Sequence, residues 1–494
     1  MDSIHRLVLA GARGGRDPLE DLARALFIAV SNDELAELTL GLLTAAGPKI
    51  WLELDSVLRP WMYGYQDPRI TLAQAVREMS NPLAVALTAC SRDGRERAKA
   101  VKHPAMRTDV RLFPVLAIRT ADWANAVQRQ ALRALSEVVS RADAAALLTL
   151  VPVVVRLDDR RRGQPATEMI RAALLRADGD TLGTVRRCED LRGRRFVFEV
   201  SLEARRMDQR QLAEAALHES DIISRTRCAE ALAAEAVEQN RPELVEELLD
   251  SSSARVRVEA LTALVRLGRT ESGPRFLCDG ASMMRLTAQW AVQRAGGDPA
   301  ELYRRYLAAP SGQGLRGLLA GLGDCGTRAD AGLALPFLSD PRPRVRAEAV
   351  RTLRRLGATV DIADLLEDPA PVVVRNVVNS LRASGPAVRI EQLWALLGPD
   401  KPRHVRQAAH RLLADRDAWS RIRADLLLLG DLDPVLSACA RTDLGSWCSR
   451  DSTRVYRGCP DEIRSELEDM LARSESIVGV ENARLLRWLI RTSR

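Results

Sequence analysis

The chain has 494 residues, of which 46% are hydrophobic, 28% are charged and only 4% are aromatic. This composition argues against a strand-rich protein and favours an almost entirely helical fold. The 73 basic and 66 acidic residues leave a formal charge of +7, a small excess for this length. Apart from Lys49, Lys99, Lys102 and Lys401 the basic residues are arginines, a bias that a GC-rich genome also produces, so the charge alone does not indicate a nucleic-acid partner.

No run of 18 apolar residues is present that would suggest a membrane span. The longest candidate, residues 147–155, is interrupted by Thr149 and Pro152, and we interpret it as a buried helix. The first 15 residues contain too short an apolar run for a signal peptide, so we predict a cytoplasmic protein. The cysteines at 90, 188, 228, 278, 325, 439, 448 and 459 lack Cys-x-x-Cys spacing and are interpreted as small hydrophobic residues, not as disulfides or zinc ligands.

Residues 1–90 are predicted to form an N-terminal helical capping region. Helical patterns over residues 19–30 and 34–43 precede an aromatic segment with Trp51, Trp61, Tyr63 and Tyr65. Exposed aromatic residues mark recognition surfaces, whereas buried ones close a core. We favour the capping function, because a terminal unit must cover the open end of a stack of repeats.

Residues 91–215 are predicted to form divergent repeats, beginning with a turn and a helix at residues 91–98. The segment 158–195 is least like a repeat, because it carries runs of mixed charge with glycines at both ends. We predict that it is an exposed loop or an extended connection. Insertions into repeat proteins often carry specificity, so this segment is the first place to look for a binding function, with a tolerated surface loop as the alternative.

Residues 216–430 are predicted to form regular repeats. From Asp221 to Arg406 one sequence pattern recurs at intervals of roughly 30 residues: an aspartate is followed six or seven residues later by an arginine. The pairs are Asp221/Arg227, Asp250/Arg257, Asp279/Arg285, Asp340/Arg346, Asp368/Arg375 and Asp400/Arg406, and Arg316 fills the gap between the third and fourth pairs. In one unit Val345, Ala349, Val350, Leu353 and Leu356 share a helical face, after Pro341 and Pro343 and before Gly357. Helices this short must stack to bury such a stripe.

The Asp-Pro turns, the Val-Arg pairs such as Val345-Arg346, and the Ala-Leu helices closed by Leu-Gly resemble HEAT repeats, including their bacterial short form. The resemblance extends from about residue 221 to residue 413. Upstream, residues 112–131 resemble a segment of bacterial HEAT proteins of unassigned activity, with Gln128 in place of the usual arginine. The family implies an all-α solenoid in which antiparallel helix pairs stack into a right-handed superhelix.

The repeated charges have two interpretations. An aspartate at the turn can accept main-chain hydrogen bonds, and an arginine early in the second helix can reach the aspartate of the next unit, which would form a ladder along the stack. The alternative is a row of arginines that binds phosphates. We favour the structural ladder, because residues that recur at the same place in every unit usually join the units.

Local basic clusters are candidates for a binding surface. The first cluster comprises Arg92, Arg95, Arg97, Lys99 and Lys102, continued by Arg107 and Arg111. The charged run Arg160, Arg161 and Arg162, further along the chain, is a candidate for the same binding surface. A second cluster comprises Arg342, Arg344, Arg346, Arg351, Arg354 and Arg355. These clusters are solvated helix faces in one interpretation and a nucleic-acid interface in the other.

No phosphate-binding loop, nucleophile elbow or His-Glu-x-x-His helix is present, so we assign no catalytic, cofactor-binding or metal-binding residue. His404 and His410 are six residues apart and face different sides of a helix. A HEAT-like DNA glycosylase uses an aspartate and aromatic residues in a basic groove. The nearest candidates here are Asp122-Trp123, and Trp290 with Arg285 and Arg294.

Residues 431–494 are predicted to cap the other end with helices over 461–472 and 481–490. A loop with Trp447, Cys448, Tyr456 and Cys459 is expected before them. The overall prediction is a non-enzymatic HEAT-repeat scaffold that binds a protein partner along its concave face. The alternative is a DNA-associated protein, including a glycosylase-like enzyme.

Overall fold

The computed structural model describes residues 2–64, 74–160, 162–309, 314–384, 388–454 and 457–492. Every regular element within these ranges is helical, which confirms the predicted all-α repeat fold. The chain divides into two compact units, Met1–Leu244 and Val245–Arg494. None of the helices in the described ranges combines the length and the apolar character that a membrane crossing requires.

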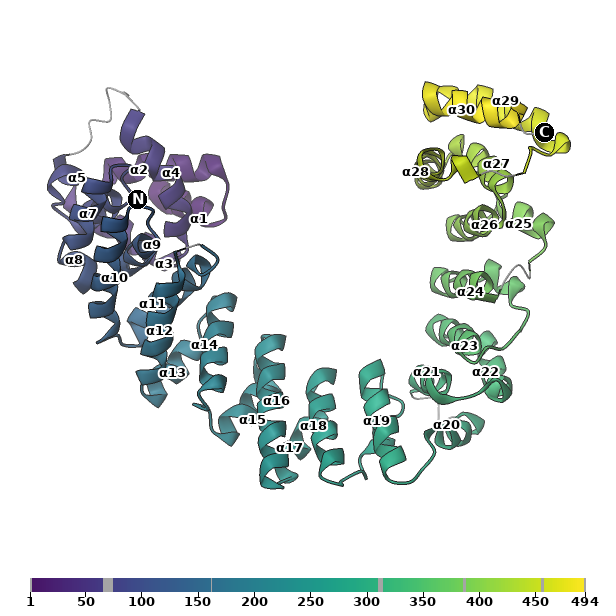
Figure 1. The fold of residues 1–494 in the computed structure, drawn as a ribbon, viewed down its shortest axis with the longest axis horizontal. Helices are drawn as coiled ribbons and strands as arrows, with labels where there is room; N and C mark the ends of the chain where they lie inside the picture. Colours follow the sequence, from purple (N-terminus) through teal and green to yellow (C-terminus); the bar gives the residue numbers. More distant parts are fainter. Residues whose placement is uncertain are drawn as a thin grey trace. The chain divides into compact units, whose positions relative to one another are not determined.

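The first unit begins with a bundle and continues as a row of helix pairs (Figure 1). Its elements are α1 (Asp2–Ala12), α2 (Arg16–Ala29), α3 (Asp33–Ala45), α4 (Ile50–Gly64), α5 (Gln74–Glu78), α6 (Pro82–Ala89), α7 (Gly94–Lys102), α8 (Ala105–Thr108), η1 (Val110–Leu112), α9 (Phe113–Thr120), α10 (Asn125–Val139), α11 (Ala144–Leu157), α12 (Gln164–Arg176), α13 (Gly179–Arg186), α14 (Leu191–Glu203), α15 (Gln209–His218) and α16 (Ile222–Gln239). The second helices of successive pairs, α7, α10, α12, α14 and α16, contact one another in series.

The bundle at the start of this unit buries a continuous apolar core. Helices α2 and α3 correspond to the two predicted helical patterns, whereas α1 was not expected from the sequence. Trp51 of α4 is 1% exposed and belongs to this core. The side chains of Trp61, Tyr63 and Tyr65 lie outside the described residues. Helix α11 contains Pro152 and buries most of its residues, as predicted for the apolar run 147–155.

The prediction of an exposed loop or extended connection over residues 158–195 is wrong. The segment holds all of α12 and α13 and the start of α14, and each of these helices buries an apolar face. The mixed charges misled the prediction because they lie on the outer surfaces and helix ends, while Ile170, Leu174, Leu182 and Val185 face the core. Asp178 and Asp190 cap α13 and α14 by accepting main-chain hydrogen bonds.

The second unit is a regular series of repeats (Figure 1). Its elements, after α17 (Glu243–Glu246) at the boundary, are η2 (Glu247–Asp250), α18 (Ala254–Arg266), η3 (Gly273–Phe276), α19 (Ser282–Arg294), α20 (Pro299–Ala308), α21 (Leu315–Cys325), η4 (Arg328–Asp330), α22 (Ala331–Ala334), η5 (Leu335–Ser339), α23 (Pro343–Arg355), η6 (Ala363–Glu367), α24 (Pro371–Ser384), α25 (Ile390–Leu396), α26 (Arg403–Arg416), α27 (Ala418–Leu429), α28 (Pro434–Arg450), η7 (Ser452–Arg454), α29 (Asp461–Val478) and α30 (Val480–Thr492).

Several repeats of the second unit have a reduced first helix. The longer second helices α18, α19, α21, α23, α24 and α26 contact one another in sequence order. Their partners are often a single turn or two, as in η2, η3 and η6, and not the full helices that a pair implies. Segments of four or five residues such as Glu247–Asp250 form single 3-10 turns, a conformation that proteins use for short connecting segments.

Helix α23 illustrates why these residues form the repeat. Pro343 occupies its first turn, where the missing N–H is not needed. Its buried stripe includes Val345, Ala349, Val350 and Leu353. Gly357 ends the helix at φ 67°, and the N–H of Ala358 then donates to the carbonyl oxygen of Leu353 at 3.0 Å. This left-handed termination reverses the chain for the next unit.

The closing helices α29 and α30 correspond to the patterns expected over 461–472 and 481–490, and each is longer than expected. The loop expected before them is wrong in part. Trp447 and Cys448 lie within α28 and are buried, because they fall on the apolar face of that helix with Leu444. Cys459 is buried outside a helix, and Tyr456 lies outside the described residues.

Candidate functional site

An arginine early in the second helix of a repeat binds its own turn and the next unit at once. Arg346 Nη1 donates to the carbonyl oxygens of Asp340 at 2.8 Å and Pro341 at 3.3 Å. Its Nε and Nη2 donate to the two carboxylate oxygens of Asp368 in the next unit, at 2.7 and 2.8 Å. Asp368 also accepts the N–H of Ala370 at the start of α24, at 2.8 Å. One arginine therefore joins a turn, a helix and the following repeat.

Ion pairs between an arginine and an aspartate of the following repeat recur in both halves of the chain. The pairs are Arg97–Asp122, Arg195–Asp221 and Arg156–Asp190 in the first unit, and Arg257–Asp279, Arg285–Asp324, Arg304–Asp330, Arg346–Asp368 and Arg406–Asp431 in the second. Arg156 and Arg304 differ from Arg346 in lying on first helices, α11 and α20. Most of these pairs are bidentate, whereas Arg257 and Arg285 each donate one hydrogen bond to the carboxylate. Bidentate arginine–carboxylate bonds are strong and directional. We refer to these pairs as the ladder. The structure places Arg257, Arg285, Arg346 and Arg406, together with Asp221, Asp279 and Asp368, in it.

Other residues of the predicted ladder lie outside it. Arg227 pairs with Glu199 at 3.0 Å and not with Asp250 of the next repeat, which pairs with Arg275. Arg375 is exposed, and it makes no ion pair within the described part of the chain. The expected Arg375 pairing is therefore wrong.

Three predicted aspartates are also used differently. Asp250 is exposed and pairs with Arg275. The Asp340 carboxylate pairs with Arg342 at 2.8 Å, and only its carbonyl oxygen serves the ladder. Asp400 is exposed and lies 3.9 Å from Lys401. The sequence period could not distinguish these positions, because each aspartate stands at a turn with the same local pattern.

Arg97 was a candidate for a binding surface, and this assignment is wrong. Its side chain is 0% exposed, and its Nε and Nη2 donate to Asp122, both at 2.8 Å. Arg119 joins the same buried cluster, since it contacts both Asp122 and Asp55 of α4. Burial alone would raise the pKa of Asp122, but the hydrogen bonds from Arg97 and from the N–H of Ala124 outweigh it and lower the pKa.

The remaining basic candidates are divided between structural and exposed residues. Arg162 donates to the carbonyl oxygens of Asp122 and Trp123 at 3.0 and 2.7 Å, so it ties its segment to the preceding turn and is not a free surface cation. Lys99 pairs with Glu96 at 2.7 Å. Exposed side chains are found for Arg92, Arg95, Lys102 and Arg160, and Arg161 lies outside the described residues.

Part of each basic cluster is neutralised by neighbouring carboxylates. In the first cluster Arg107 pairs with Glu137, and Arg111 pairs with Asp109 and Glu37. In the second cluster the pairs are Arg342–Asp340, Arg346–Asp368, Arg351–Glu348 and Arg355–Asp324. Paired cations attract a polyanion less than free ones.

The candidate residues for glycosylase chemistry do not form a catalytic site. Asp122 is 3% exposed and is held by two arginines and a main-chain N–H, so it cannot approach a substrate. Trp123 is exposed and packs against the guanidinium of Arg97, 5.4 Å from the ring centroid. Arg285 is 4% exposed and belongs to the ladder.

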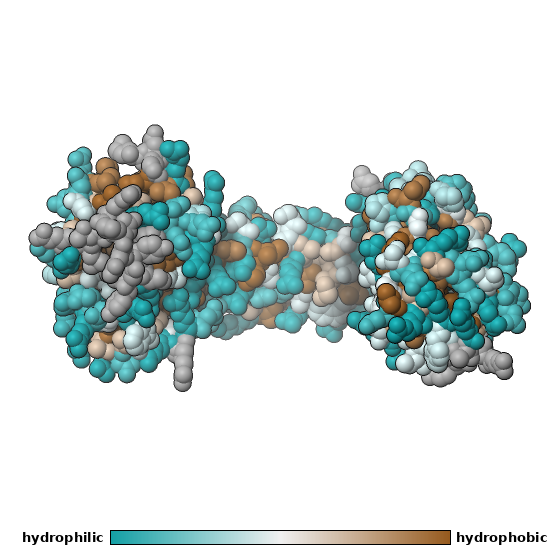
Figure 2. Space-filling model, turned by 90° about the horizontal axis from the view of Figure 1, so that it is seen from above, coloured by the Kyte–Doolittle hydropathy of each residue, from teal (hydrophilic) through white to brown (hydrophobic). Residues whose placement is uncertain are grey.

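Large apolar side chains are exposed at the starts of several second helices. They are Trp123 before α10, Leu191 in α14, Ile222 and Ile223 in α16, Met283 and Leu286 in α19, and Leu432 and Val435 around the start of α28. We call these residues the apolar helix starts. Isolated exposed hydrophobic residues are ordinary. These eight lie near the starts of five second helices, α10, α14, α16, α19 and α28. Figure 2 shows apolar surface as patches within a mainly hydrophilic exterior.

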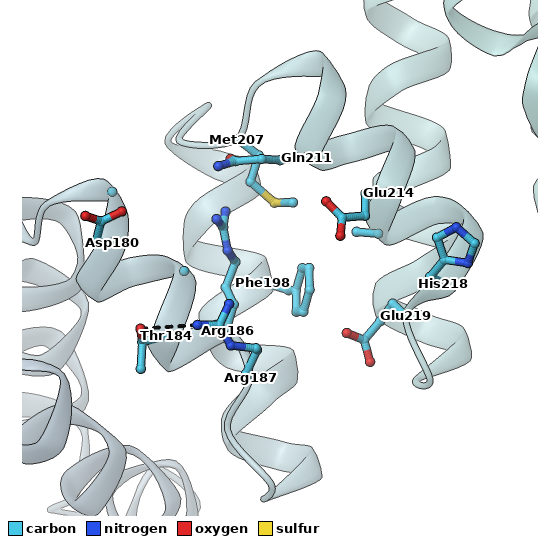
Figure 3. A pocket seen from close by; sticks show the side chains of 13 residues that line it. Asp180, Thr184, Arg186, Arg187, Phe198, Met207, Gln211, Glu214, His218 and Glu219 are labelled. Atoms are coloured by element: carbon cyan, nitrogen blue, oxygen red, sulfur yellow. Dashed lines mark hydrogen bonds between the residues drawn. The ribbon is translucent and has the colours of Figure 1, made fainter.

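A cleft of about 620 Å³ lies in the first unit between α13, α14 and α15. Figure 3 shows Phe198 of α14 near its centre, with Arg186 of α13 on one side and Glu214 of α15 on the other. Met207 and Gln211 line the end toward which the Arg186 side chain extends. The cleft adjoins the C-terminal half of the segment 158–195, where the sequence suggested looking for binding.

Arg186 differs from the ladder arginines. It is 9% exposed, and its Nη1 has no hydrogen-bond partner. Within the described part of the chain Arg186 forms no ion pair, and the charge of Asp208 acts on it without a hydrogen bond. Burial lowers the pKa of the Arg186 guanidinium, with weaker opposing effects from nearby acidic groups. Sequence reasoning missed Arg186, because it does not stand at the repeated position and its isolation is a tertiary property.

One group of potential metal ligands occurs among the described residues. Single ligand atoms of His410, Asp425 and Asp443 lie within 4.8 Å of one another. Arg421 already binds both oxygens of Asp443, at 2.7 and 2.6 Å, and its charge opposes a further cation. His410 Nε2 lies 2.6 Å from Asp425 Oδ1. We interpret the group as a partly buried ion-pair cluster.

The cysteines form no disulfide bonds in the structure. All eight are free; Cys90, Cys188, Cys228, Cys448 and Cys459 are buried, and only Cys278 and Cys439 are exposed. Burial raises the pKa of Cys90 and Cys228 to about 12, so both remain thiols at neutral pH. The prediction of small buried hydrophobic residues therefore holds for most of them.

The fold and the ladder define the chain as an α-helical repeat protein. Residues 333–414 match the family of HEAT repeats, so these repeats are HEAT repeats. No curated protein matches the chain.

Among solved structures, the chain is similar to the karyopherin Kap121p bound to the extreme C-terminus of the protein phosphatase Cdc14p. The identity is 11% over 97% of this chain and 67% of that one, with a TM-score of 0.31. Importin beta is 11% identical over 97% of this chain and 65% of its own length, with a TM-score of 0.32. An engineered protein is 17% identical over 90% of this chain and 98% of its own, with a TM-score of 0.16. At these scores the likenesses carry no information on function.

Proposed function

We propose that the chain is a non-enzymatic HEAT-repeat scaffold that binds a protein partner along the surface lined by its second helices. The observation that supports this proposal is the recurrence of apolar helix starts. Met283 is 62% exposed and Leu286 is 48% exposed on one turn of α19, while Arg285 between them is buried in the ladder. A helix that buries its charge and exposes its apolar side chains leaves a surface that a protein partner can cover.

A protein partner fits this surface better than a nucleic acid does. Phosphates are bound mainly by unpaired lysine and arginine side chains. In the two basic clusters the ladder and neighbouring carboxylates occupy seven arginines: Arg97, Arg107, Arg111, Arg342, Arg346, Arg351 and Arg355. Apolar side chains exposed near the start of a helix, such as Met283 and Leu286, suit an extended or helical segment of another protein.

The proposal is tested by covalent capture at the surface itself. A photo-crosslinking residue is placed at Met283 in the full chain, and the same residue is placed at Leu38 of α3 as a control, because Leu38 is exposed but not at a helix start. We expect one protein to be crosslinked at Met283 and not at Leu38 in the cells that produce this chain.

The captured protein must also depend on the apolar side chains. Replacing Met283→Ser together with Leu286→Ser should weaken its binding to the purified chain by roughly tenfold or more, while Leu38→Ser should leave binding unchanged. Equal binding by both variants would contradict the proposal. Retention of the purified chain on duplex DNA, lost steeply with salt, would favour the nucleic-acid alternative instead.

A further inference from the structure

We infer that the cleft between α13, α14 and α15 is a binding site for a monocarboxylate with an apolar body, and that Arg186 pairs with its carboxylate group. This site is separate from the apolar helix starts and goes beyond the scaffold function. The inference begins with the environment of Arg186. A guanidinium has five N–H donors, and a buried one normally spends them on carboxylates or carbonyl oxygens.

The buried arginines of the ladder differ from Arg186 in their hydrogen-bond partners. Arg97 and Arg285 are 0% and 4% exposed, and each donates to a carboxylate and to two main-chain carbonyl oxygens. Arg186 is similarly buried but makes no hydrogen bond or ion pair within the described residues. A buried charge without a partner is costly to the folded state, so its retention beside a cleft points to a ligand that supplies the missing acceptors.

The lining of the cleft narrows the chemistry of that ligand. Phe198 and Met207 provide an apolar surface between the helices. Glu214 makes no ion pair in the described structure, and Asp180 stands at the rim. Arg187 and His218 also line the cleft, but Arg187 is exposed, so Arg186 is the buried guanidinium of the lining. Its planar fork matches a single carboxylate, and the carboxylates of Asp180 and Glu214 disfavour a doubly charged phosphate. The volume of about 620 Å³ admits a small molecule or the C-terminal residues of a peptide.

Calorimetric titration of the full chain tests the inference with defined probes. Phenylacetate represents a free monocarboxylate, a hexapeptide ending in phenylalanine with a free C-terminus represents a polypeptide source, and the corresponding amides lack the charge. We expect at least one acid to bind and its amide to bind roughly tenfold more weakly or not at all. The acid that binds more tightly identifies the source of the carboxylate.

Variants then assign the binding to Arg186. Arg186→Met should weaken binding of the acid by roughly tenfold or more, and Arg186→Lys by less, because lysine keeps the charge but loses the fork. Arg176→Met is the matched control, since Arg176 is an exposed arginine of α12 outside the cleft and its loss changes the net charge equally. Unchanged binding to Arg186→Met would overturn the assignment.

Thermal unfolding separates a ligand site from a structural arginine. Without any ligand, Arg186→Met should unfold at the same temperature as the natural chain or higher, because the substitution removes an unpaired buried charge. A marked fall in the unfolding temperature would show that Arg186 holds the fold and would overturn the inference. Failure of both acids to bind the natural chain would also overturn it, while leaving the scaffold proposal untouched.

Discussion

Buried charges in this chain fall into two groups that differ in their partners. The ladder residues Arg97 and Asp122 are completely buried and satisfy one another, together with main-chain groups. Breaking such a pair leaves an uncompensated charge and typically costs about 3–5 kcal/mol. The second group is only partly satisfied. It includes Asp425, which is 0% exposed, contacts His410 through Oδ1 and has no hydrogen-bond partner for Oδ2 within the described residues.

The environment of Asp425 makes the stability of the second unit depend on pH. Burial raises the pKa of Asp425 from 3.8 to about 6, and the hydrogen bond and charge of His410 oppose this only in part. Asp443 and Arg421 face the same group and act in opposite directions. Between pH 4 and 6 the folded chain holds a proton that the unfolded chain has released. The contribution of Asp425 to stability therefore falls as the pH rises through this window.

We predict that Asp425→Asn stabilises the chain at pH 7 by roughly 1–3 kcal/mol and has little effect near pH 4, where the natural carboxyl is protonated. Urea unfolding of the natural chain and the variant at several pH values measures this difference. Asp469→Asn serves as the control, because Asp469 is exposed in α29. A variant that is less stable at pH 7 would show instead that the His410–Asp425 ion pair stabilises the fold.

At the scale of the element, close approach of helices depends on small residues at particular contacts. Gly321 of α21 faces Tyr303 of α20, and a Cβ atom on Gly321 would lie 2.1 Å from the Tyr303 Cζ. Tyr303 cannot move aside easily, because it is fully buried and its hydroxyl donates to the carbonyl oxygen of Leu277 at 2.9 Å. The packing of α20 on α21 therefore requires glycine at this position.

We predict that Gly321→Ala destabilises the second unit by roughly 1–3 kcal/mol, because the added methyl group forces the two helices apart. The matched control is Gly445→Ala in the interior of α28, where a Cβ atom meets nothing within 4 Å. There the same substitution should stabilise by roughly 0.5–1 kcal/mol through the higher helix propensity of alanine. Chemical denaturation of both variants measures the difference, and effects of the same sign would contradict the packing argument.

At the scale of the whole molecule, the contacts of a repeat protein are mainly between neighbouring repeats. Stability is then close to a sum of local terms, and one damaged interface need not unfold distant repeats. The chain is expected to behave in this way, because its two units, Met1–Leu244 and Val245–Arg494, each have a core of their own. A single unfolding free energy would then describe the chain poorly.

We predict that Arg97→Met accelerates amide hydrogen exchange in α6 to α10 and leaves α23 to α30 unchanged. The reason is that Arg97 joins the turn before α7 to Asp122 at the start of α10, both in the first unit. Arg95→Met is the control, because Arg95 is exposed on the same helix. Faster exchange throughout the second unit would show that the chain unfolds as a single cooperative body.

The sequence by itself determined the helical class, the period of about 30 residues and most of the helices in the regular repeats. These features are local, since an apolar stripe, a capping residue and a terminal glycine are read within a few turns of chain. The same reasoning failed over residues 158–195, where surface charges concealed helices whose buried faces become evident only against their neighbours.

Only the tertiary structure decided which charged residues bind which partners. Arg97 and Arg95 look alike in the sequence, but Arg97 is buried in the ladder and Arg95 is exposed. Arg186 has no distinguishing local pattern, and its isolation beside the cleft results from the packing of three helices. The physical reason is that these pairs join residues 20 to 40 positions apart in neighbouring repeats, and the period alone does not say which charged residues of the two repeats meet.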